Sequence, residues 1–67
     1  MTRPELHALV DIVMDARERT GIDLGIEVYN GCVLVDWDNQ YINSSESYPA
    51  FSDFTQAVKE YIKTLEG

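Results

Sequence analysis

The dipeptide Asn30-Gly31 constrains the fold of this chain more than any other feature of its sequence. A two-residue type I′ hairpin loop requires positive φ at both of its residues, and Asn followed by Gly adopts that conformation at the lowest steric cost. Such a loop places Tyr29 opposite Cys32 and sets the register of every pair before them. We therefore predict an antiparallel hairpin over residues 23–38 with one fixed register.

The predicted register sorts the side chains of the hairpin into two different faces. One face collects the apolar side chains of Leu24, Ile26, Val28, Val33, Val35 and Trp37. The other face collects Gly25, Glu27, Tyr29, Cys32, Leu34 and Asp36. This division is typical of an antiparallel sheet that buries one face. We expect the apolar face, with Trp37 on it, to belong to the core.

A second turn signal, Asp38-Asn39, predicts a third strand over residues 40–44. With these two residues as the loop, Ile42 lies on the core face, and Tyr41 lies on the outer face opposite Asp36. A loop one residue later would change these partners. The sequence therefore leaves a sheet of two strands and a sheet of three strands both open.

Apolar residues at helical spacing predict one helix before the strands in the sequence and one helix after them. The first helix begins with a capping box formed by Thr2 and Glu5 and ends near Gly21. The second begins with Ser52 as its N-cap and Asp53 in its positive first turn. The apolar stripes comprise Leu6, Leu9, Val10, Val13 and Ala16 in the first helix, and Phe54, Ala57, Val58, Tyr61, Ile62 and Leu65 in the second.

Two one-sided helices and a one-sided sheet bury their apolar surfaces together when both helices pack on the same face of the sheet. We therefore predict an α+β fold with a two-layer α-β-β-(β)-α order and an antiparallel sheet of two or three strands. We expect residues 1–67 to form a single compact domain. The second face of the sheet is then left in contact with solvent.

The net negative charge of the chain is concentrated in its middle. The net charge is −7, and the 39 residues 20–58 contain no Lys or Arg. Because phosphates attract Lys and Arg, we expect no direct binding of nucleic acid or of anionic membranes. The N-terminus lacks the pattern of a signal peptide, no apolar stretch reaches transmembrane length, and Cys32 is the only cysteine. We therefore expect a cytoplasmic protein without an internal disulfide.

Catalytic and metal-binding patterns are weak in this sequence. His7, Asp11 and Asp15 follow one another at a spacing of four residues and could offer ligands to a metal on one helix face. The alternative, which we favour, is a solvated face on which Asp11 pairs with His7 and Asp15 pairs with Arg19. Cys32 has no adjacent base that would activate it. We predict that the protein is not an enzyme and holds no metal or cofactor.

Acidic and tyrosine side chains on the outer sheet face and in the adjoining loops are the best candidates for a functional site. A field of one sign steers a basic partner, and tyrosine provides flat contact area at a low entropic cost. The predicted partner-binding residues are Glu27, Tyr29, Asp36, Asp38, Tyr41, Glu46, Tyr48 and Asp53. Two plainer explanations stay open: the tyrosines shield the sheet by cross-strand packing, and the acidic residues serve only solubility.

In its length, its acidity and its compact fold without a catalytic motif, the chain resembles the small phage-encoded inhibitors of host defence, anti-CRISPR proteins in particular, several of which mimic DNA. The resemblance covers the whole chain and assigns no individual residue. It implies an inhibitor in the cytoplasm of the host cell that blocks DNA binding by a Cas protein or Cas complex. The two helices are nearly neutral, so any mimicry of DNA would be confined to one face.

The same sequence is also compatible with other functions. The acidic surface would equally suit an antitoxin or immunity-type partner of a basic toxin, or an accessory protein-interaction module. A small metal-binding protein or enzyme centred on His7 is a third and weaker reading. We expect a monomer or a weak homodimer, because Glu27 and Asp36 disfavour contact between the outer faces of two copies.

Overall fold

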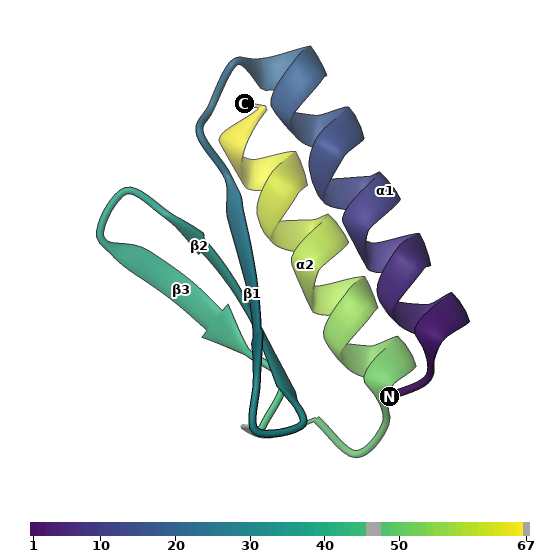
Figure 1. Cartoon of the computed structure of the whole chain (residues 1–67). Helices are drawn as coiled ribbons and strands as arrows, with labels where there is room; N and C mark the ends of the chain where they lie inside the picture. Colours follow the sequence, from purple (N-terminus) through teal and green to yellow (C-terminus); the bar gives the residue numbers. More distant parts are fainter. Residues whose placement is uncertain (46–47, 67) are drawn as a thin grey trace.

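The computed structural model describes residues 1–45 and 48–66 and contains two helices and three strands. In chain order these are α1 (Arg3–Thr20), β1 (Gly25–Tyr29), β2 (Cys32–Trp37), β3 (Gln40–Asn43) and α2 (Phe51–Leu65). Both helices lie side by side against one face of the sheet (Figure 1). The predicted two-layer α+β fold is therefore confirmed, in its three-stranded form.

The sheet has the register that the two turn signals predict. Its strand order is β1-β2-β3 and both pairs are antiparallel. Tyr29 pairs with Cys32 across a loop in which Asn30 and Gly31 have φ values of 47° and 74°. In the second hairpin, Asp36 pairs with Tyr41, as expected when residues 38 and 39 form the loop. The third strand is thus present, and β2 is the central strand of the sheet.

Helix α1 has the predicted boundaries and caps. The Thr2 hydroxyl accepts a hydrogen bond from the Glu5 N–H, and the Glu5 carboxylate accepts one from the Thr2 N–H at 2.8 Å. At the other end, Gly21 adopts a φ of 73° and its N–H donates to the carbonyl of Arg17. Such a left-handed residue ends a helix most easily when it is glycine.

The N-cap of helix α2 lies two residues before the predicted one. The N-cap is Ala50, with φ −140° and ψ 157°, whereas Ser52 lies within the first turn. The prediction of Ser52 as the cap is therefore wrong. Asp53 forms half of a capping box, because its carboxylate accepts a hydrogen bond from the Ala50 N–H at 3.1 Å. Ala50 offers no side-chain oxygen in return.

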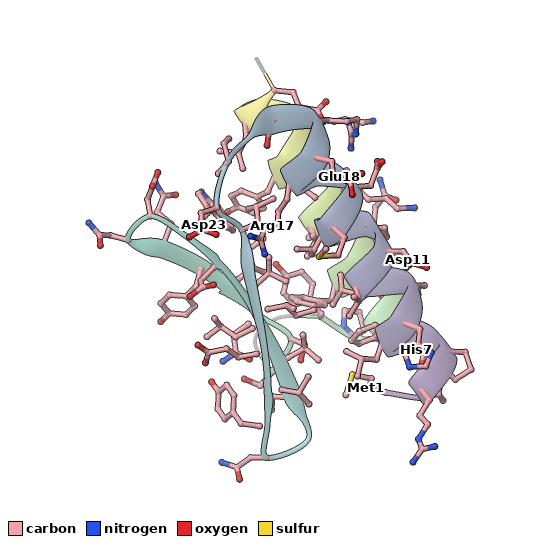
Figure 2. The ribbon with its side chains drawn as sticks, turned by 45° about the horizontal axis from the view of Figure 1, so that its top comes forward. Met1, His7, Asp11, Arg17, Glu18 and Asp23 are labelled. Carbon is pink, nitrogen blue, oxygen red and sulfur yellow. The ribbon has the colours of Figure 1, made fainter. Side chains whose placement is uncertain are left out.

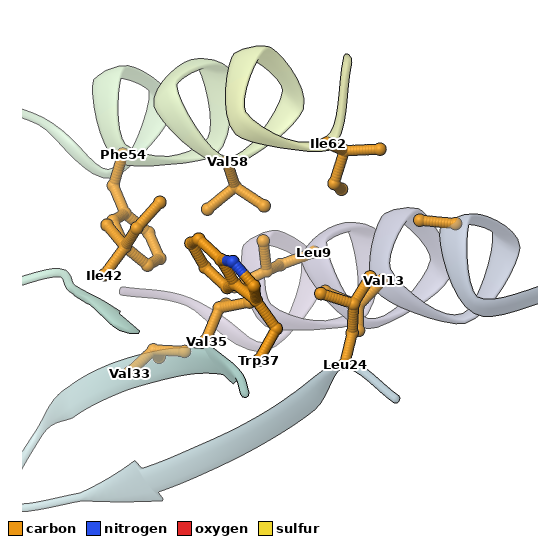
Figure 3. Close-up of a cluster of buried hydrophobic side chains, with 11 residues drawn as sticks. Leu9, Val13, Leu24, Val33, Val35, Trp37, Ile42, Phe54, Val58 and Ile62 are labelled. Carbon is orange, nitrogen blue, oxygen red and sulfur yellow. The ribbon is translucent and has the colours of Figure 1, made fainter. Parts of the chain in front are cut away.

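The core lies between the sheet and the two helices. Figure 3 shows Trp37 on the sheet pointing towards side chains of both helices, among them Leu9 and Val58. Trp37 is 5% exposed, which confirms its predicted place in the core. The buried residues are Leu9, Val13, Ala16, Leu24, Val33, Val35, Trp37, Ile42, Phe54, Val58 and Ile62.

One residue of the predicted apolar face is not covered. Val28 is 53% exposed although the register places it on the same face as the buried Val33 and Val35. Ile26, on the same strand, is only half-buried. The helices therefore cover the inner face of β2 and β3 more completely than that of β1.

The two helices run parallel, with the start of α1 beside the start of α2 and both C-terminal ends together (Figure 1). Their dipoles therefore point in the same direction. Acidic side chains, Glu5 and Asp53, lie in the two first turns, and the basic side chains of Arg17, Arg19 and Lys63 lie in the last turns. Charges of these signs at these ends stabilise the aligned dipoles.

Neither helix in the described part of the chain combines the length and the apolar composition needed to span a bilayer.

Candidate functional site

The outer face of the sheet, which is the face turned away from the helices, gathers half of the predicted partner-binding residues. Its members follow from the two registers, because residues on one face alternate along each strand. We call this surface the outer face: it consists of Glu27, Tyr29, Cys32, Leu34, Asp36, Tyr41 and Asn43.

Tyr29 extends across the middle strand. Its hydroxyl accepts a hydrogen bond from the Asn43 side-chain N–H at 3.1 Å, and these residues belong to β1 and β3, on the two sides of β2. The side-chain oxygen of Asn43 accepts from the N–H and the hydroxyl of Ser45, which fixes its amide. Cross-strand packing therefore accounts for the position of Tyr29, yet the residue remains 43% exposed.

Tyr41 projects further into solvent than Tyr29. It is 60% exposed and lies opposite Asp36 on the neighbouring strand. An exposed aromatic ring next to a carboxylate offers both apolar contact area and a charge to a partner. These two tyrosines and Asp36 thus lie on the same face of the sheet.

Asp36 occupies space that only a glycine on the adjacent strand leaves free. A Cβ atom placed on Gly25 would clash with the Asp36 Oδ1 atom. The carboxylate of Asp36 therefore lies over the backbone of β1, the strand that also carries Glu27.

The acidic residues of the middle of the chain do not share one environment. Asp23 forms an ion pair with Arg17 at 3.3 Å, and the two side chains lie close together in Figure 2. Asp53 accepts the hydrogen bond at the start of α2. Within residues 1–45 and 48–66, Glu27, Asp36 and Asp38 form no ion pair. The outer face and its adjoining turn therefore carry three carboxylates without a basic counterpart and no basic side chain, whereas the unpaired carboxylates of the helices share their layer with all five basic residues.

Asp38 lies in that turn, directly after β2, and is exposed. It has a φ of 51°, a conformation that Asp tolerates better than most residues with a side chain. The turn therefore holds this carboxylate on a tight loop beside the sheet.

The remaining predicted residues lie elsewhere or outside the described chain. The Tyr48 ring packs edge-on against Phe54 with a centroid distance of 5.4 Å, so it belongs partly to the core. Asp53 lies at the start of α2 in the helical layer. Glu46 lies outside the described residues. The outer face thus unites four of the eight predicted residues, with Asp38 next to them.

The alternative metal site on α1 is not assembled. Figure 2 shows His7 and Asp11 on the outside of the helix, and the described residues contain no group of three or more His, Cys, Asp or Glu side chains that could hold a metal. Asp15 instead accepts a hydrogen bond from Arg19 at 2.9 Å, as predicted, and Arg19 also pairs with Glu66. The predicted pairing of His7 with Asp11 is wrong, since no ion pair joins these two residues.

A hollow of about 290 Å³ lies between the two helices. Its lining residues are Ile12, Asp15, Arg19, Lys59, Ile62, Lys63 and Glu66. Asp15 and Glu66 are already paired with Arg19. No histidine, cysteine or serine belongs to this lining.

No protein-family model, no curated protein and no solved structure matches this chain. Its function must therefore be inferred from its own surface.

Proposed function

We propose that this protein is a non-enzymatic inhibitor that binds a basic protein surface through its outer face and the Asp38 turn. The observation that carries the proposal is the presence of Glu27, Asp36 and Asp38 without an ion pair, next to two exposed tyrosines. A strongly basic patch is the electrostatic footprint of a nucleic-acid-binding protein. We therefore propose a nucleic-acid-binding protein as the target, with a Cas protein or Cas complex as the first candidate.

The location of the charges supports binding more than solubility. A surface that serves only solubility carries both signs interspersed, whereas this one carries a single sign around aromatic side chains. A field of one sign raises the rate of encounter with a basic partner, and this effect weakens as salt screens the charges. The protein would act by occlusion, because its bound outer face would cover the site at which the target binds DNA.

Displacement of DNA from a purified Cas complex tests this proposal directly. The fraction of DNA bound to the complex, measured by electrophoretic mobility shift, should fall as the protein is added. A variant with Glu27→Gln, Asp36→Asn and Asp38→Asn should inhibit roughly tenfold or more weakly. Asn is chosen at position 38 because it tolerates positive φ.

The matched control removes the same number of charges from the helices. Asp11, Glu18 and Glu60 are exposed and form no ion pair among the described residues, so Asp11→Asn, Glu18→Gln and Glu60→Gln change the net charge equally. The control should inhibit almost as well as the wild type. Equal losses in both variants would mean that only net charge matters, and undiminished inhibition by the first variant would contradict the proposed binding face.

A further inference from the structure

Strand β1 is an edge strand, and its outward backbone groups have no partner strand within residues 1–45 and 48–66. In an antiparallel pair, hydrogen-bonded and non-hydrogen-bonded positions alternate, and the residues that flank a two-residue loop are a hydrogen-bonded pair. Tyr29 flanks the loop, so Tyr29, Glu27 and Gly25 direct their N–H and C=O groups towards β2. Ile26 and Val28 therefore direct theirs away from the sheet.

The same two residues carry apolar side chains that the helices leave partly uncovered. Val28 is 53% exposed and Ile26 is half-buried, both on the inner face. The opposite edge differs, because the inner-face residue Ile42 of β3 is only 5% exposed. An additional strand beside β1 would cover apolar surface and satisfy free backbone groups at once, whereas one beside β3 would gain less.

A second copy of the chain is a poor occupant of this edge. An antiparallel pair of β1 strands that uses the free groups of both Ile26 and Val28 places Glu27 directly opposite its own symmetry mate, and like charges in this position repel. Sliding the pair by two residues recruits either Leu24, whose N–H already donates to the Ile22 carbonyl, or Asn30 of the turn. The position opposite Glu27 instead suits a basic side chain.

We infer that the free edge of β1 binds an extended strand of the target, in which apolar residues alternate with Lys or Arg. The apolar side chains would cover Ile26 and Val28 on the inner face, and a basic side chain would lie beside Glu27 on the outer face. This inference rests on the proposed function, since the added strand belongs to the same basic target. It names the mode of binding: backbone hydrogen bonds give affinity, and the alternation gives specificity.

A synthetic peptide can serve as the probe for this edge. The probe is a soluble eight-residue peptide of alternating lysine and valine, and the comparison peptide replaces each lysine by glutamate. At saturating lysine peptide, the exchange of the Ile26 and Val28 amide protons with solvent, measured by NMR on the isotope-labelled protein, should slow roughly fivefold or more. The amides of Tyr41 and Asn43, which point to the free edge of β3, should be unaffected, and the glutamate peptide should have no effect.

A charge exchange provides the second arm. Glu27→Lys should reverse the preference, so that the glutamate peptide protects the two amides and the lysine peptide no longer does. The variant keeps a negative net charge, so a reversal would report the local contact and not the overall charge. Its folded state is checked by the dispersion of the same NMR spectrum.

Three outcomes would overturn the inference. They are an unchanged exchange of the Ile26 and Val28 amides, protection of the β3 amides instead, and protection that grows with protein concentration without peptide, which would identify a second copy as the occupant. Shifts of Asp36 and Tyr41 amides without slower exchange at β1 would keep the outer face as the binding site and refute the added strand. Failure of the proposed function appears separately, as unchanged DNA binding in the displacement assay.

Discussion

Gly25 and Asp36 illustrate how one residue pair can serve both fold and surface. Glycine normally weakens a strand by roughly 0.5–1 kcal/mol relative to alanine, because it loses more conformational freedom on folding. At position 25 it also leaves the space that the Asp36 carboxylate occupies. The weaker strand therefore allows a charge to lie close to the backbone of β1.

We expect the effect of Gly25→Ala on the free energy of unfolding to depend on the residue at position 36. In the wild type the new Cβ displaces the Asp36 carboxylate from its rotamer, and the cost of about 1 kcal/mol should offset the gain from the stiffer backbone. In an Asp36→Ala background the same substitution should stabilise by roughly 0.5–1 kcal/mol. Urea unfolding followed by circular dichroism measures both, and an identical change in the two backgrounds would contradict the contact.

Individual site residues could be predicted from the sequence where alternation governs them. Glu27, Tyr29, Asp36 and Tyr41 share the outer face because the two turns fix which residues of each strand point to that face. Tyr48 lies in a loop without any period, and nothing in the sequence indicates that its ring packs on Phe54. The hydrogen bond from Asn43 to Tyr29 spans two strand pairings and depends on rotamers that a residue pattern does not specify.

At the scale of elements, the two helices differ in how their N-termini are satisfied. The first turn of α1 has a complete capping box, whereas α2 has only the half that Asp53 supplies. An uncapped N-terminus leaves backbone N–H groups without a protein acceptor. The start of α2 is therefore a place where stability can be added.

Ala50→Ser should complete the capping box of α2. A serine oxygen at the N-cap accepts a hydrogen bond from a backbone N–H of the first turn, which typically stabilises by about 1 kcal/mol relative to alanine. The extended backbone of Ala50 already suits this role. Thermal unfolding measures the gain, and the paired variant Ser52→Ala should leave stability almost unchanged. A large loss of stability from Ser52→Ala would instead indicate that Ser52 is the N-cap.

The capping box of α1 should make stability depend on pH in the acid range. The hydrogen bond from the Thr2 backbone N–H, followed by the contribution of the Thr2 side chain, holds the pKa of Glu5 below its ordinary value of 4.5. A lowered folded-state pKa stabilises above the unfolded value, and this contribution is lost as pH falls through the folded pKa. Glu5→Gln should therefore be less stable than the wild type at neutral pH, and the difference should vanish in acid.

Urea unfolding across this pH range measures that difference. Glu18→Gln, on the same helix and exposed, provides the control and should show a smaller change between neutral and acid pH. A constant difference between wild type and Glu5→Gln at all pH values would contradict the role of the Glu5 carboxylate.

Element types and strand register could be predicted because local signals were strong: a type I′ turn, a capping box, a left-handed glycine and two apolar stripes. The start of α2 was mistaken because serine is the stronger capping residue, while the path of the preceding loop decides which residue adopts the extended conformation. The exposure of Val28 depends on how far the helices extend over β1. The alternation of residues along a strand predicts only the face of the sheet on which a side chain lies, and not whether that face is covered.

At the scale of the whole molecule, charge is divided between the two layers. The basic side chains, Arg3, Arg17, Arg19, Lys59 and Lys63, all belong to the helices, and the sheet carries none. Because the described ion pairs lie at the C-terminal ends of the helices and at Asp23, the outer face stays uncompensated. This division of charge would turn the outer face towards a basic target as the two proteins approach each other.

The position of Trp37 gives the protein a built-in optical reporter of its core. The indole is the only one in the chain, it is 5% exposed, and its ring centroid lies 5.4 Å from that of Tyr61 on α2. Intrinsic fluorescence should therefore shift to longer wavelength when the sheet separates from the helices, and should stay constant when a partner occupies the outer face or the β1 edge. A wavelength shift on titration with the lysine peptide, at constant circular dichroism, would contradict this expectation. One emission spectrum thus separates loss of folding from loss of binding for every variant described above.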